Sequence, residues 1–233
     1  MDGIIIAPGP HAAEPGRALP LLAKSAARTV LIDRIYPELP FDQVGTDNVE
    51  PVAALVEHLA ATHGHRRIGF IAGLPGLATT EERLTGFGLG VRRTGAGGDS
   101  DLVQIGGSSR EGGEIATTML LALDVPPTAL IAGNNAMTVG MLRTLNGRRI
   151  AVPTQMAIAG FDDFEWADLL VAPLTAIAQD WERIGTRAVE LLIRRLDELT
   201  PAAHIIQRTA IRLQVRRSCG CSGVFRTVRI PVG

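Results

Sequence analysis

Short apolar runs rich in β-branched residues alternate with helix-like patterns along nearly the whole chain, and this alternation limits the folds open to it. The runs at 4–6, 29–32, 68–71, 102–105, 129–132, 156–159 and 174–178 read as buried strands. Helical spacing of apolar residues lies between them, as in Val52, Leu55, Val56 and Leu59. The alternation predicts an α/β fold with a mainly parallel sheet, covered by helices on both faces.

Local signals mark where several helices begin and end. Asp47 or Asn48 can cap the first helix, and Gly64 can end it. The Thr-Thr-Glu-Glu segment at 79–82 has the pattern of a capping box and predicts the start of the next helix. Two further helices are predicted by apolar residues at helical spacing: Ile115, Met119, Leu120 and Leu123, then Ile184, Ala188, Leu191 and Leu192.

Composition and charge exclude several classes of protein. The 233 residues are 46% hydrophobic and 20% charged, which is typical of a globular chain rather than a disordered one. Lys plus Arg is 23 and Asp plus Glu is 24, so this near-neutral chain lacks the basic surplus that binds nucleic acid. Two cysteines exclude a disulfide framework and suit a reducing compartment.

The first residues do not resemble a targeting segment. Asp2 is acidic and Pro8 ends a short apolar run, whereas a secretory signal needs a basic start and a longer apolar stretch. No window reaches the ~18 apolar residues of a membrane span. We therefore expect a cytoplasmic protein with no membrane partner.

Polar side chains follow the predicted strands at their carboxyl ends, where open α/β sheets bind ligands. Asp33, Asn134 and Asp162 follow three of these strands. Gln179 follows a fourth, and Arg83 lies in the first turns of a helix. Carboxylates accept hydroxyl donors, amides offer a donor and an acceptor, and a guanidinium offers a rigid fork of donors. This mixture suits a polyhydroxylated ligand.

A structural interpretation stands beside each of these assignments. An Asp after a strand is often a turn residue or a helix cap, and Gln179 could be a plain hinge residue. Arg83 could form a surface ion pair with Glu82 or Asp163. These alternatives remain open from the residues alone.

Nine segments match the pattern of one known family in order and spacing. They are DGIIIAP at 2–8, VLIDR at 30–34, VGTDN at 44–48, GHRRIGFIAG at 64–73, ERLTGF at 82–87, PTALIAGNN at 127–135, GFDD at 160–163, PLTAI at 173–177 and RRSC at 216–219. Over nearly its whole length the chain resembles the effector-binding core of LacI/GalR (lactose-repressor-type) transcriptional regulators.

The resemblance implies a periplasmic-binding-protein-like fold, in which two Rossmann-like lobes are joined by crossover strands and enclose a small ligand. It places an incomplete N-terminal lobe at 1–45 plus 180–208, a C-terminal lobe at 46–178 plus 209–219, and a tail at 220–233. Met1 falls at the third strand of the family's first lobe. The helix-turn-helix headpiece that reads DNA in the family is therefore expected to be absent from this chain.

The resemblance also implies a function. It predicts an effector-sensing and dimerisation domain of a transcription regulator, with a sugar or sugar-like effector, a homodimer partner and operator DNA reached only through the missing headpiece. The family positions that match Asp33, Arg83, Asn134, Asp162 and Gln179 contact effector. Alternatives are a transporter's sugar-type solute-binding protein and a truncated, non-functional remnant. We expect no enzyme, because no catalytic triad, metal or cofactor spacing is present.

Two departures from the family bear on the ligand. Where the family often carries an aromatic residue that stacks on the ligand, this chain has Gly-Gly-Ser-Ser at 106–109, and Ser108 offers no ring. Trp166, Phe161 or Phe164 could compensate, or could be ordinary partly buried aromatics. Asn135 stands where the family more often has Asp.

Histidine and cysteine residues do not predict a metal site. His58, His63 and His65 straddle the end of a helix, where a protonated histidine is favoured by the helix dipole. Cys219 and Cys221 have no second cysteine pair to complete a zinc motif, so two free thiols are expected. We therefore expect neither a metal nor a cofactor.

Overall fold

The computed structural model describes residues 2–10, 14, 17–97, 99–198, 203–223 and 225–230. Their elements are β1 (Gly3–Ile6), α1 (Ala18–Leu22), β2 (Arg28–Asp33), β3 (Asp42–Thr46), α2 (Val49–Glu57), η1 (His58–Thr62), β4 (Ile68–Ala72), α3 (Ala78–Thr94), η2 (Ser100–Leu102), β5 (Val103–Ile105), α4 (Arg110–Leu121), β6 (Ala129–Ala132), α5 (Asn135–Gly147), β7 (Ala157–Phe161), β8 (Thr175–Ala178), α6 (Trp181–Asp197), β9 (Ile206–Thr209), β10 (Ile211–Val215), η3 (Arg217–Cys219) and β11 (Arg226–Ile230). The predicted α/β fold is confirmed.

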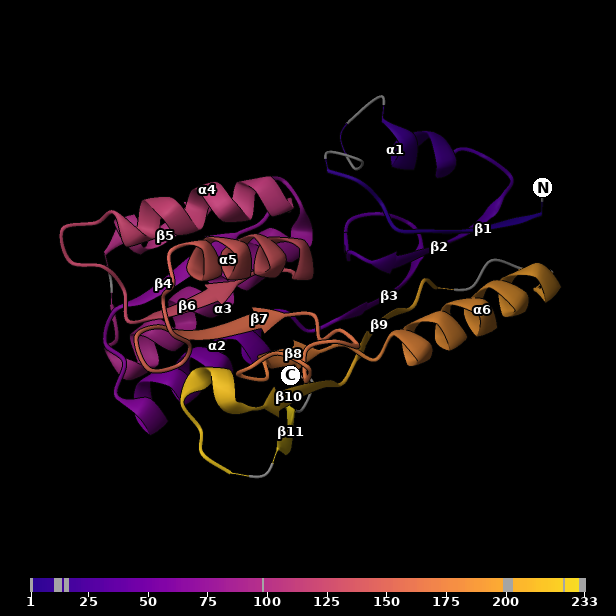
Figure 1. The fold of residues 1–233 in the computed structure, drawn as a ribbon. Coiled ribbons are helices and arrows are strands. Elements are labelled where there is room, and N and C mark those ends of the chain that lie inside the picture. The colour runs from indigo at the N-terminus through magenta and orange to yellow at the C-terminus, as the bar shows by residue number, and fades with distance from the viewer. Residues whose placement is uncertain are drawn as a thin grey trace.

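The larger of two sheets has the strand order β11-β10-β8-β7-β6-β4-β5. Strands β4 to β8 run parallel to one another, and β10 pairs antiparallel with both of its neighbours, β8 and β11. Side chains alternate across it: Phe70 packs with Leu55 of α2 and Phe87 of α3, whereas Ile71 packs with Leu120 of α4 and Met141 of α5. Helix pairs therefore cover both faces of this sheet, as the pattern predicts (Figure 1).

The smaller sheet has the order β1-β2-β3-β9, and its strands are parallel. On one face, Val30 and Val44 pack against Ala188 of α6. On the other, Leu31 packs against Leu19 of the short helix α1. Figure 1 shows α6 and α1 on opposite sides of these strands.

Three crossings join the two sheets within the described residues. The chain passes from β3 into α2 at 46–49, from β8 into α6 at 178–181, and from β9 into β10 at 209–211. Because these short crossings bring the carboxyl ends of β2, β3, β7 and β8 to one junction, polar residues at those ends come together there.

The predicted capping box at 79–82 is wrong. Helix α3 begins at Ala78 with Leu77 at the N-cap position, so Thr79 and Thr80 lie inside the first turn and are buried. Glu81 instead accepts a hydrogen bond from the Gly76 amide at 3.3 Å. The cap of α2 is supplied by Asp47, which accepts from the Val49 amide at 2.9 Å, and the helical run ends before Gly64 as predicted.

The predicted buried face of α4 is rotated. Ile115 and Met119 are half exposed, while Leu120 is buried as expected. The rotation follows from close packing on α5, because a Cβ at Gly113 would lie 2.6 Å from the Met137 carbonyl oxygen. Small residues thus set the contact between these helices.

Four strands of the structure lack a counterpart in the sequence predictions: β3, β9, β10 and β11. Strand β11 lies in the segment interpreted as a tail and pairs with β10 from Ile211↔Ile230 to Val215↔Arg226. None of the described helices is both long and apolar enough to cross a bilayer.

Candidate functional site: a polar cavity between the two sheets

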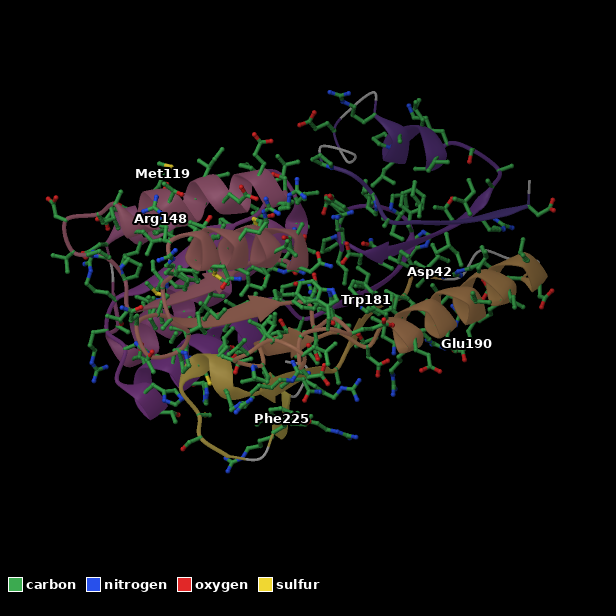
Figure 2. All side chains as sticks on the ribbon, viewed as in Figure 1. Asp42, Met119, Arg148, Trp181, Glu190 and Phe225 are labelled. Atoms are coloured by element: carbon green, nitrogen blue, oxygen red, sulfur yellow. The ribbon has the colours of Figure 1, made fainter. Side chains whose placement is uncertain are left out.

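A cavity of about 260 Å³ lies where the two sheets meet, and all five predicted site residues line it. Its walls are formed by Asp33, Arg34, Phe70, Gly73, Leu77, Thr79, Thr80, Arg83, Ser108, Gly133, Asn134, Asn135, Asp162, Gln179 and Trp181. Elements of both sheets contribute, and Figure 2 shows Trp181 at the start of α6 beside this junction. The structure thus brings the five together, and their contact with a ligand stays a prediction.

Three cavity residues adopt a left-handed backbone conformation that residues other than glycine rarely take. Asp33 ends β2 with φ 70°, and Asp162 follows β7 with φ 73°. Ser108 has φ 58° and follows β5. Each such residue costs on the order of 1–3 kcal/mol and tends to persist where function requires it. These conformations make the carboxyl ends of the strands the candidate functional edge.

Arg83 is only 8% exposed, which rules out the predicted alternative of a surface ion pair. Its Nε donates to Asn48 Oδ1 at 2.9 Å and its Nη1 donates to the Gly133 carbonyl oxygen at 2.6 Å. The guanidinium carbon lies 3.5 Å from the centroid of the Phe161 ring. Nη2 makes no hydrogen bond within the described residues, so it remains a donor for a ligand.

The two acidic residues named as alternative partners of Arg83 are engaged elsewhere. Glu82 pairs with Arg208 at 2.5 Å, and Asp163 pairs with Arg216 at 2.7 Å. Burial lowers the pKa of the Arg83 guanidinium, whereas the charges of Asp162 and Asp33 act to raise it. Arg83 is therefore a buried cation that faces the two cavity carboxylates.

Asp162 and Gln179 form a pair across the cavity floor. Gln179 Nε2 donates to Asp162 Oδ1 at 2.5 Å, which orients both side chains. Gln179 Oε1 is buried and accepts no hydrogen bond within the described part of the chain. A buried acceptor without a partner is costly, so this oxygen is suited to a hydroxyl donor from a ligand. Gln179 is thus more than a hinge residue.

Asp33 faces the same space from the smaller sheet. Burial raises the pKa of its carboxyl, although the positive charges of Arg34 and Arg83 act to lower it. Arg34 Nη2 lies 3.4 Å from Asp33 Oδ2. The cavity is therefore lined by two acidic and two basic side chains, whose formal charges cancel.

Asn134 serves partly as a helix cap, the structural role weighed for such residues. Its Oδ1 accepts from the Met137 amide at 2.8 Å at the start of α5. Its Nδ2 makes only a long contact of 3.5 Å with the Ser108 carbonyl oxygen. The amide nitrogen of Asn134 is thus the group that this residue can most readily offer to a ligand.

Two aromatic residues line the cavity, the buried Phe70 and the half-exposed Trp181, and sequence reasoning assigned neither to the site. The Trp181 side chain is 50% exposed. Phe161 lies buried beneath Arg83. Phe164 and Trp166 contact each other with ring centroids 3.9 Å apart and ring planes tilted by 37°, and neither lines the cavity. Its position in the chain could have predicted Trp181 as a cavity residue, because it lies two residues after the predicted site residue Gln179, at the start of a helix.

Comparisons with known proteins identify the relationship. The family model described as a periplasmic binding protein-like domain matches residues 56–219. The HTH-type transcriptional repressor CytR of Escherichia coli (strain K12) is 33% identical over 167 residues, which cover 72% of this chain and 49% of CytR. The ribose operon repressor of the same strain is 31% identical over 179 residues, covering 75% of this chain and 54% of the repressor.

A solved structure of similar fold is the transcriptional regulator CelR–cellobiose complex, with 30% identity and a TM-score of 0.80. The match covers 93% of this chain and 65% of CelR. The chain spans about half the length of the two curated repressors. With its two-sheet architecture and the match over 56–219, the chain belongs to the periplasmic-binding-protein-like domain family and corresponds to the core of LacI-family transcriptional regulators.

Proposed function

We propose that this chain is the effector-sensing core of a LacI-family transcriptional regulator and binds a neutral, polyhydroxylated small molecule between its sheets. The observation that carries the proposal is the cavity itself. Asp33 and Asp162 supply acceptors, Arg83 supplies a donor, and Gln179 Oε1 is a buried acceptor without a partner. Because the charged groups cancel, a neutral sugar-like ligand fits better than an anion.

Trp181 supports a sugar ring as the ligand. Its half-exposed indole lines the cavity and offers an apolar face, while hydroxyl groups need the polar side chains opposite. CelR, a structural relative, is described in complex with cellobiose. The proposed lobes, 1–45 with 180–208 and 46–178 with 209–219, would close on the ligand, and closure would pass to a DNA-reading headpiece.

A homodimer belongs to the same proposal. Ile105 of β5 is 53% exposed, and Ile115 and Met119 of the adjacent helix α4 are 55% and 50% exposed. Exposed apolar side chains grouped at one sheet edge are typical of an interface between subunits. We expect the double variant I115E/M119E to elute as a monomer, as measured by light scattering, while wild-type protein elutes as a dimer.

Isothermal titration against neutral mono- and disaccharides and nucleosides tests the site. We expect Asp162→Asn and Gln179→Leu each to lower affinity at least about fivefold, since a hydrogen bond to a charged or buried group is worth about 1–3 kcal/mol. Asp168→Asn is the matched control, because Asp168 is exposed on the loop after β7 and does not line the cavity. Unchanged affinity in both cavity variants would exclude this cavity. Preference for anionic ligands would exclude the ligand class.

A further inference from the structure

Two histidines and two cysteines converge beside the larger sheet, and each histidine lies at least 158 residues from the cysteine that it contacts. His58 begins η1, the π-helical turn after α2, and His63 follows this turn. Cys219 ends η3, and Cys221 lies two residues later. One ligand atom of each side chain, imidazole nitrogen or thiol sulfur, lies within 4.8 Å of the other three. In the sequence these histidines and cysteines stand in separate segments, and neither segment alone predicts a metal site.

The spacing of these atoms matches a tetrahedral metal site. His58 Nε2 lies 3.4 Å from Cys219 Sγ and 3.7 Å from Cys221 Sγ, and His63 Nε2 lies 3.3 Å from Cys221 Sγ. With Zn–S bonds of about 2.3 Å and Zn–N bonds of about 2.0 Å, a tetrahedral ion separates its nitrogen and sulfur ligands by about 3.5 Å. Three of the four nitrogen–sulfur separations are thus close to those of a Cys₂His₂ site.

Backbone conformation explains why the four side chains meet. His58 and His63 are five residues apart, which regular α-helix would place on different faces. The π-helical turn has a wider repeat of i to i+5, so the two rings contact each other with centroids 5.2 Å apart. Gly220 adopts φ 104°, and a Cβ there would lie 3.1 Å from His63 Nδ1. Glycine therefore lets the Cys-Gly-Cys turn pass beneath His63.

Burial and access also suit a bound ion. Cys219 is buried, and none of the other three side chains is fully exposed. A cavity of about 900 Å³ is bordered by His58, Thr62 and Cys221 and connects the cluster with solvent. Thr62 Oγ1 lies 3.5 Å from His58 Nδ1, the ring nitrogen that would face away from the ion.

We propose that His58, His63, Cys219 and Cys221 bind one Zn²⁺ ion. Soft thiolates combined with imidazoles in a tetrahedral S₂N₂ set favour zinc over calcium, magnesium or manganese. Because four protein side chains complete the coordination, the site is structural and leaves no position for a substrate. The ion would join the end of α2 to the segment that leads into β11, far from the ligand cavity.

The test uses the full chain, purified without a histidine tag and kept reduced, and Zn²⁺ and Co²⁺ as probes. We expect one Zn²⁺ per chain by elemental analysis. Co²⁺ should give the intense visible d–d bands of tetrahedral cobalt and a thiolate-to-cobalt charge-transfer band. Both observations require no variant, so they do not depend on whether a mutant folds.

Variants assign the ligands. Cys221→Ser and His63→Ala should each weaken Zn²⁺ binding more than about 100-fold in a chelator competition, because loss of a second-shell partner alone costs about 10–100-fold. His65→Ala is the matched control, since His65 binds Thr128 Oγ1 at 2.8 Å and lies outside the cluster. Its Zn²⁺ affinity should equal that of the wild type. Substoichiometric binding by reduced wild-type protein, or undiminished affinity in both ligand variants, would overturn the proposal.

Discussion

The two sheets share one architecture but differ in how completely they are covered. The larger has helix pairs on both faces and two extensive apolar clusters, one on each side of its strands. The smaller has α6 on one face, the five-residue α1 on the other, and two small clusters. Stability should therefore be distributed unequally between them.

The smaller sheet relies on a buried ion pair where the larger relies on apolar packing. Asp42 of β3 is 1% exposed and accepts from Arg195 of α6 at 2.6 Å and 2.8 Å. It also accepts from the Ile205 amide at 2.7 Å, beside β9. One carboxylate thus links a strand, a helix and the neighbouring strand. A buried pair of this kind is costly to break even where it adds little net stability.

Hydrogen exchange should show the largest difference between the sheets. Amides of β6, an interior strand of the larger sheet, should exchange at least about 100-fold more slowly than amides of β1, an edge strand of the smaller one. Mass spectrometry of peptides covering 129–132 and 3–6 measures both in one experiment. Equal protection would mean that the sheets open as one unit, and the comparison would fail.

Removing the carboxylate of Asp42 should give the next largest effect. Asp42→Ala leaves the Arg195 guanidinium without its buried partner, which costs about 3–5 kcal/mol. We expect the free energy of unfolding of the smaller sheet to fall by this amount. Urea-induced unfolding, monitored by hydrogen exchange of peptides from β2 and β3, measures it. Arg194→Ala is the control, because its ion pair with Glu198 is more exposed. A loss that falls equally on β6 would contradict the unequal distribution.

Sequence predicts the larger sheet better than the smaller one, for a physical reason. β4, β6 and β7 are buried on both faces, so their apolar runs are visible in the sequence. β3 is not predicted from sequence because two polar residues, Asp42 and Gln43, are buried in it. Their hydrogen-bond partners, Arg195 and the Tyr36 backbone, are brought to them only by the tertiary structure. β10 alternates buried apolar residues with more exposed polar ones, and this period-two pattern is visible in the sequence and could have predicted the strand.

The candidate site was predictable only in part. Chain order and family resemblance pointed to five residues that the structure brings to one cavity, and their contact with a ligand stays a prediction. Sequence could not show that the side-chain oxygen of Asn134 accepts the hydrogen bond that caps α5. Nor could it show the histidine–cysteine cluster, whose hydrogen-bonded members lie 158 to 163 residues apart in the chain. Such contacts depend on the fold and not on local pattern.

Acid should weaken the smaller sheet by less than Asp42→Ala does. Burial alone would raise the pKa of the Asp42 carboxyl, but hydrogen bonds from Arg195 and Ile205 outweigh burial and hold the pKa below its ordinary value of 3.8. The folded state therefore gains stability from this group above that value and loses it as pH falls through the lowered pKa. Protonation still leaves a neutral carboxyl that can hydrogen-bond, hence the smaller effect.

The measurement is urea unfolding of wild type and Asp42→Asn between pH 6 and pH 3, because the amide variant cancels the contribution of other carboxyl groups. The stability advantage of the wild type should shrink towards the acid end of this range. A difference that grows on acidification would mean that the Asp42 pKa is raised in the folded state.

The smallest expected effect concerns the junction between the sheets. Arg208 of β9 pairs with Glu82 of α3, and Glu82 also accepts from Asn48 Nδ2 at 2.7 Å. Asn48 in turn accepts from Arg83, so the network extends from one sheet through the other to the ligand cavity. Glu82→Gln keeps the size of the side chain and removes its charge. Because the pair is partly exposed, we expect a loss of about 0.3–1 kcal/mol.

This loss should appear as a fall in ligand affinity of no more than about fivefold. The difference between Glu82→Gln and wild type should become smaller at high salt, since screening weakens partly exposed pairs. Titration at low and high salt measures it, with Glu81→Gln as a control on the same helix and outside the Arg208 pair. If the two sheets close on ligand as a hinged pair, Glu82→Gln should change affinity and leave the exchange of β6 unaltered. Slower or faster exchange in β6 would show instead that Glu82 supports the larger sheet itself, and that the junction is no hinge.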